Sequence, residues 1–117
     1  MKITRCEPPR RFSVGLSNQI EISDCGEIQL SNDEQVTFVK DSGARYDFAA
    51  KSWGYYATPS INGRLKQEGF KTALVANSAG RIYVMVVEVS KLDEFSKYCL
   101  ADNQMVLEWL DERGSKS

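Results

Sequence analysis

The sequence predicts an α+β fold, with about five or six antiparallel strands in hairpins and two C-terminal helices packed on one face of the sheet. Apolar and polar residues alternate through the first half of the chain, and glycine, asparagine and aspartate separate the alternating runs. The last quarter instead carries apolar residues at helical spacing. Apolar residues make up 42% of the 117 residues, which is enough for one compact core.

This composition predicts a single domain over residues 12–113, with a short segment at each end. Residues 1–11 carry four basic side chains and one acidic side chain, and Pro8 and Pro9 oppose regular structure. We therefore expect a basic extended arm at 1–11. The small and polar residues 114–117 are expected to form a flexible tail.

The first half of the chain has the period of antiparallel strands. Residues 19–23 alternate, the pattern breaks at 24–26, and it resumes over 27–31, which is typical of a hairpin with one buried face. Turn residues then lead into two further runs, 35–40 and 45–49. Short strands at nearly constant spacing predict a meander.

A second hairpin is predicted further along the chain. Residues 71–76 and 81–88 are rich in β-branched side chains and flank a four-residue link that contains asparagine and glycine. The uninterrupted apolar run at 82–87 predicts a central strand covered on both faces. A short helix or an irregular loop near 59–68 connects the meander to this hairpin, because Thr58 or Ser60 can cap a helix there.

Two helices are expected at the C-terminal end. Ser90 supplies an N-cap with Asp93 at the third helical position, a variant of the capping box. A last helix is expected after Asp102, with Val106, Trp109 and Leu110 as its apolar stripe. Both helices are interpreted as covers for the sheet.

Several classes of function are excluded or disfavoured by composition. The chain has no histidine, which excludes catalytic Ser-His-Asp and Cys-His arrangements and most catalytic zinc sites. No nucleophile or cofactor motif is present, so we expect no cofactor and no metal, and the interpretation leans away from an enzyme. The formal net charge of −1 argues against nucleic acid as a partner.

The expected location is the cytoplasm. The longest apolar run, at 82–87, is far shorter than the roughly 20 residues of a membrane helix, so no membrane partner is expected. The N-terminal residues have no signal-peptide pattern. Three cysteines without a CxxC pair fit a reducing compartment.

One segment departs from the strand and helix patterns and is the candidate site. Residues 51–71 contain four basic side chains and one acidic side chain, and three large aromatic residues lie at 53–56. A helix start with Arg64 could hold an anionic group, and the aromatic rings could stack on a base or a sugar ring. The candidate ligand-binding residues are Trp53, Tyr55, Tyr56, Thr58, Ser60, Asn62, Arg64 and Lys66. An open alternative is that the aromatic residues belong to the core and the cations to a solvated surface.

Two functions remain after these exclusions. The first is a non-catalytic binding or assembly module that forms a homodimer, because a small sheet with helices on one side leaves a face or an edge to cover. The second is a binding protein, or a weak enzyme, for a small anionic or ring-bearing metabolite. It would use the aromatic and basic segment 53–66.

Overall fold

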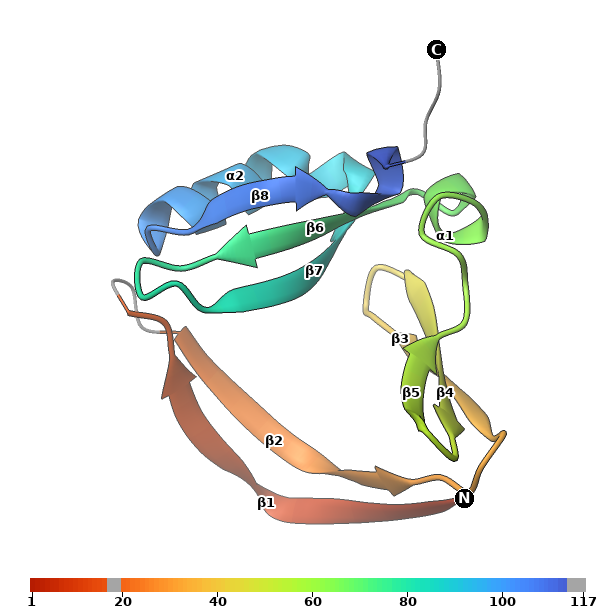
Figure 1. Ribbon diagram of the computed structural model, residues 1–117. Helices are drawn as coiled ribbons and strands as arrows, with labels where there is room; N and C mark the ends of the chain where they lie inside the picture. Colours follow the sequence, from red (N-terminus) through yellow and green to blue (C-terminus); the bar gives the residue numbers. More distant parts are fainter. Residues whose placement is uncertain (17–19, 114–117) are drawn as a thin grey trace. The chain divides into compact units, whose positions relative to one another are not determined.

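The described part of the chain is mostly β-structure, with 53% of the described residues in strands and 18% in helices. The computed structural model describes residues 1–16 and 20–113 (Figure 1). Its contacts divide the chain into unit 1, Met1–Val14 with Ile20–Pro59, and unit 2, Gly15–Gln19 with Ser60–Ser117. The predicted tail at 114–117 lies outside the described residues. The predicted single domain over 12–113 requires that the two units fold together, and this stays a prediction.

Unit 1 begins with a two-stranded antiparallel sheet of β1 (Lys2–Val14) and β2 (Ile20–Gln29). The segment expected to be an extended arm is mostly strand, since Lys2–Arg5, Arg10 and Arg11 pair with β2. The prolines fit because they lie within residues 6–9, which stand opposite the single residue Cys25 where the register shifts. The hairpin predicted within 19–31 is wrong. Those residues form one strand whose partner is β1, and the break at 24–26 marks the register shift.

The rest of unit 1 is a meander in which the predicted strands at 35–40 and 45–49 are joined by a third strand, at 54–57, that the sequence did not predict. Three short strands form an antiparallel sheet in the order β3 (Gln35–Val39), β4 (Arg45–Lys51) and β5 (Gly54–Ala57). The register places the apolar residues on one face, where the ring of Phe48 contacts Phe38 and Tyr46 at centroid distances of 6.1 and 5.4 Å. The other face is largely polar, and on it Thr37 donates a hydrogen bond of 2.6 Å to Asp47.

Unit 2 contains a three-stranded antiparallel sheet in the order β7-β6-β8. Its hairpin of β6 (Phe70–Ala76) and β7 (Ile82–Glu88) confirms the prediction, and the one-turn helix α1 (Arg64–Gln67) precedes it. The prediction that 82–87 is the central strand is wrong. The centre is β6, whose Ala73 and Val75 are fully buried, whereas β7 lies at an edge.

The C-terminal part of unit 2 has one long helix, so the predicted pair of helices packed on a sheet is wrong. The 3-10 turn η1 (Val89–Lys91) leads into α2 (Leu92–Ala101), and no side-chain hydrogen bond caps either, so Ser90 is not the predicted cap. The expected last helix is instead strand β8 (Met105–Trp109) and the 3-10 turn η2 (Leu110–Glu112). The apolar residues of 106–110 fit both periods, and pairing with β6 selects the strand.

Buried hydrophobic side chains are distributed unevenly between the units. In unit 1 the buried hydrophobic residues are the small Ala49 and Ala50. Unit 2 has the larger set, Leu65, Phe70, Ala73, Val75, Val87 and Cys99. Unit 1 is therefore held mainly by backbone pairing and by partly buried contacts such as those of Phe48 with Phe38 and Tyr46, and its exposed ion pairs, such as Arg10–Asp24 and Arg11–Glu21, each at 3.2 Å, contribute little.

Among the described residues, no helix has the length and apolar character needed to cross a membrane.

Candidate functional site

The aromatic half of the candidate segment lies in unit 1, around the turn between β4 and β5. Lys51 pairs with Gly54, so Ser52 and Trp53 form a two-residue turn. Trp53 remains 69% exposed, and its ring lies nearly parallel to that of Tyr56, with centroids 5.9 Å apart and an interplanar angle of 24°. We call these two rings the aromatic shelf.

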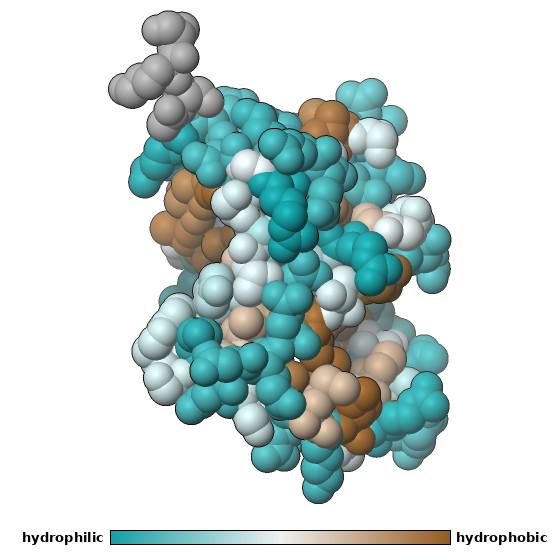
Figure 2. All heavy atoms as spheres, turned by 90° about the vertical axis from the view of Figure 1, so that its right-hand side faces the viewer, coloured by the Kyte–Doolittle hydropathy of each residue, from teal (hydrophilic) through white to brown (hydrophobic). Residues whose placement is uncertain are grey.

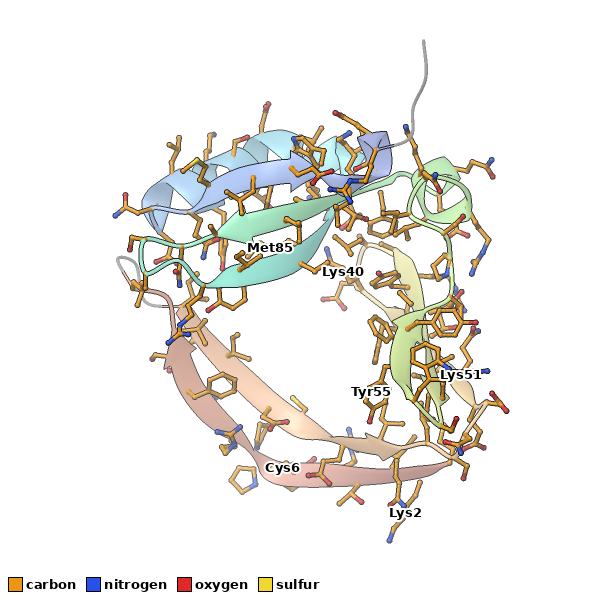
Figure 3. The ribbon with its side chains drawn as sticks, in the orientation of Figure 1. Lys2, Cys6, Lys40, Lys51, Tyr55 and Met85 are labelled. Carbon is orange, nitrogen blue, oxygen red and sulfur yellow. The ribbon has the colours of Figure 1, made fainter. Side chains whose placement is uncertain are left out.

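Tyr55 and Tyr56 project to opposite faces of the sheet because consecutive strand residues alternate. Tyr56 is opposite Ala49 and shares the polar face with Lys51, whereas Tyr55 is opposite Ala50. Figure 3 shows Tyr55 and Lys51 on opposite sides of β4 and β5. The sequence thus grouped three aromatic residues that the strand divides into a pair and a single ring.

Tyr55 lines an apolar hollow of about 240 Å³ within unit 1. The other lining residues come from β2, the turn after it, β3 and β4: Ile28, Leu30, Val36, Phe38 and Phe48. Pockets for small ligands are typically about 300–1,000 Å³ and present a few polar groups. This hollow is smaller and almost entirely apolar, so it is better described as incomplete packing between strands.

Polar side chains border the aromatic shelf on the same face of the sheet. Thr58 donates a hydrogen bond of 2.7 Å to the Gln35 amide oxygen, and Lys51 forms an ion pair with Asp33. The hydrogen bond to Asp33 raises the pKa of the Lys51 ammonium, with a smaller contribution from Tyr56. Figure 2 views the molecule from the side to which Lys51 projects, and hydrophilic residues cover most of that side.

The basic half of the candidate segment lies in unit 2, at the start of α1. The Ser60 hydroxyl accepts a hydrogen bond of 3.2 Å from the Arg64 N–H, and a Cβ at Gly63 would overlap that hydroxyl. Asn62 and Lys66 are exposed. Arg64 forms an exposed ion pair of 3.1 Å with Glu68, one turn along the chain. The eight candidate residues therefore belong to two units, and their use as one site stays a prediction.

Unit 2 also holds a buried charge cluster that the sequence analysis missed. The fully buried Asp111 carboxylate accepts hydrogen bonds from the Lys71 ammonium at 2.9 Å and from the Thr72 N–H at 3.0 Å. Burial raises the pKa of this carboxyl, but the hydrogen bonds from Lys71, from Thr72 and from the Asp111 backbone, together with the positive charge of Lys71, outweigh it and hold the pKa below the ordinary aspartate value. Lys71 also binds Glu112 and lies 5.0 Å from the centre of the Trp109 ring. The cluster joins β6 to η2 and is structural in character.

Neither the acidic residues in the turns nor the buried cysteine supplies a further site in the described part of the chain. Of the acidic residues in the turns, Asp24 binds Arg10, Asp33 binds Lys51, and Glu34 binds the N-terminal amine. In the described part of the chain, no group of three or more potential ligands could hold a metal ion. Cys99 is buried, and burial raises the pKa of its thiol, which opposes a reactive role.

The outer edge of β7 is a feature that the sequence analysis assigned to the interior. Within the described residues, β7 pairs with β6 only, and its Ile82 and Val84 are 61% and 64% exposed. The register places both on the face opposite Trp109, which contacts Phe95 of α2. In Figure 1, α2 accordingly covers one side of the β7-β6-β8 sheet. The apolar run at 82–87 thus forms an edge strand with exposed apolar side chains.

The chain matches no protein-family model, and comparisons with curated proteins and with solved structures find no match either.

Proposed function

We propose that this protein is a non-catalytic assembly module whose two copies pair along the edge strand β7. The observation that carries the proposal is the apolar edge itself. Six uncharged residues, 82–87, run along it without lysine, proline or a register shift, which are the usual means by which proteins block an exposed edge. An unprotected edge of this kind favours pairing with another strand.

The charges at the ends of β7 favour a second copy as the partner. Arg81 precedes the apolar run and Glu88 ends it. Twofold-symmetric, antiparallel pairing centred on Val84 or Met85 brings Arg81 of each copy to the same end of the paired strands as Glu88 of the other, one residue out of register. Both ends of the paired strands then carry opposite charges, and the exposed Ile82 and Val84 of the two copies join in one apolar surface.

Light scattering after size-exclusion chromatography tests the proposal with the full chain. The wild type is expected at twice the mass of one chain, and Val84→Lys at the mass of one chain, because a lysine in the middle of the edge blocks pairing. The matched control is Leu100→Lys, since Leu100 is an exposed apolar residue of α2. A wild type that stays monomeric across a wide concentration range would contradict the proposal.

A charge exchange tests the antiparallel orientation. Arg81→Glu alone and Glu88→Arg alone are each expected to weaken the dimer because they place like charges at the same end of the paired strands. The double variant restores opposite charges and is expected to recover the dimer. Equal weakening by all three variants would contradict antiparallel pairing, because Arg81 of one copy and Glu88 of the other would then not lie at the same end of the paired strands.

A further inference from the structure

The aromatic shelf combines a large exposed surface with a fixed orientation. Trp53 is held in a two-residue turn, and its near-parallel contact with Tyr56, which is 43% exposed, sets the direction of its ring. Aromatic rings that remain in water while held rigid are common in binding surfaces, because they offer contact area at little cost in conformational entropy. The shelf is therefore prepared to receive a flat ligand.

The groups around the shelf are polar and electrically balanced. Lys51 and Asp33 neutralise each other, and the hydrogen bond from Thr58 to the Gln35 oxygen leaves the Gln35 amide nitrogen as a donor. The border thus offers donors from Gln35 and Lys51 and an acceptor from Asp33. A ligand with many hydroxyl groups can use both kinds.

The spacing of the strands sets the length of the ligand. Gln35, Ala49 and Tyr56 lie opposite one another on three neighbouring strands of the same face. Neighbouring strands are about 4.8 Å apart, so the row from Tyr56 to Gln35 covers roughly 10 Å. A single six-membered ring cannot reach from one end to the other, whereas two or more linked rings can.

The charge of unit 1 argues against a phosphorylated ligand. Its residues carry seven basic and eight acidic side chains, so it has no excess of cations for phosphate groups. The partly positive C–H face of a pyranose ring, by contrast, suits the negative faces of aromatic rings. A neutral sugar chain therefore fits both the rings and their border.

We propose that the aromatic shelf, bordered by Gln35 and the Asp33–Lys51 pair, binds a neutral oligosaccharide of linked pyranose rings. The exposed face of the Trp53 ring, which Tyr56 supports from the other side, stacks on one sugar, and Gln35 contacts the hydroxyl groups of the next. This site lies in unit 1 and is independent of the pairing along β7 in unit 2.

The test is an NMR titration of ¹⁵N-labelled full-length protein with cellohexaose, chitohexaose and maltohexaose, and with adenosine monophosphate as the charged ring-bearing alternative. At least one sugar is expected to shift the Trp53 indole resonance. Trp53→Ala is expected to weaken binding by about 5- to 150-fold, which corresponds to about 1–3 kcal/mol for stacking on one aromatic ring. Trp53→Phe keeps a flat ring and is expected to retain most of the affinity.

The control variant is Tyr98→Ala, because Tyr98 is an exposed aromatic residue on α2 in unit 2. It is expected to bind the sugar as the wild type does. The proposal is overturned if none of the three sugars binds, if Trp53→Ala binds as tightly as the wild type, or if only the nucleotide shifts the resonance. Amide spectra of each variant establish that it is folded. Light scattering on Trp53→Ala measures whether this variant still forms the dimer, so loss of sugar binding can be distinguished from loss of pairing along β7.

Discussion

At the scale of single residues, Asp111 has the largest expected effect on stability because it is a buried charge. Asp111→Asn removes the negative charge that faces the Lys71 ammonium and weakens the hydrogen bond from the Thr72 N–H. Hydrogen bonds to charged groups contribute about 1.5–3 kcal/mol, so we expect a loss of that order in the free energy of unfolding. Urea denaturation at neutral pH measures it.

The matched control for this substitution is Glu112→Gln. Glu112 binds the same ammonium but is largely exposed, and an exposed ion pair contributes at most about 1 kcal/mol. An equal loss in both variants would show that burial of Asp111 is not the source of the effect.

The lowered pKa of Asp111 predicts a specific dependence on pH. The carboxyl releases its proton more readily in the folded state, so its contribution to stability is complete above the unfolded pKa of about 3.9. The contribution is then lost as the pH falls through the folded pKa. We therefore expect the stability difference between wild type and Asp111→Asn to be constant near neutral pH and to shrink below about pH 4. A difference that grows on acidification would contradict this sign.

Gly26 is the second residue whose environment permits a definite prediction. A Cβ there would overlap the Thr4 carbonyl oxygen on the facing strand, and φ is +153°. The atoms that a Cβ would meet belong to the backbone of Thr4 and Arg5 and cannot easily move aside. Gly26→Ala is therefore expected to destabilise the protein by about 1–3 kcal/mol. Gly43→Ala is the control, since Gly43 also has a positive φ but open space around it. A larger loss in Gly43→Ala would show that backbone conformation matters more than the close approach.

Which of these residues were visible in the sequence depends on the range of their contacts. The exposed aromatic segment at 53–56 stood out because its composition is local. Asp111 gave no signal, because its partners Lys71 and Thr72 lie about forty residues away in the chain. Strand pairing sends Tyr55 and Tyr56 to opposite faces, and the position of Trp53 depends on a two-residue turn that the sequence does not define.

At the scale of elements, α1 packs on its unit through one buried side chain. The helix has only four residues, and Leu65 is its buried one. Leu65→Ala leaves a cavity, and core Leu→Ala substitutions cost about 2–5 kcal/mol. Leu100→Ala in α2 is the matched control because Leu100 is 78% exposed, so its expected cost is below about 0.5 kcal/mol. Thermal unfolding of the two variants measures the contrast, and similar melting temperatures would contradict it.

The sequence located most elements, but their type and neighbours depended on tertiary pairing. The runs 35–40, 45–49, 71–76 and 81–88 became strands because alternation and turn residues agreed. Residues 105–109 became a strand although their apolar spacing suited a helix, since β6 offered an edge for pairing. The same pairing left β7 at the outside, a result that an apolar run cannot indicate by itself.

At the scale of the whole molecule, the distribution of the core predicts unequal stability in the two units. Unit 2 buries leucine, valine and phenylalanine side chains, whereas the buried hydrophobic residues of unit 1 are two alanines. Burial of a large apolar side chain contributes about 1.5–3 kcal/mol, and a two-stranded sheet such as β1–β2 is marginally stable alone. Unit 1 therefore has less free energy to oppose opening of its strands.

Native-state hydrogen exchange tests this difference in the full chain. We expect the slowest amides in β6, which is central and buried, and faster exchange in β1 and β2. Leu65→Ala is expected to accelerate exchange in β6, β7 and β8 and to leave unit 1 nearly unchanged, because Leu65 belongs to unit 2. If exchange rises equally in all strands, the units unfold as one, and residues 12–113 behave as the single domain that the composition predicts.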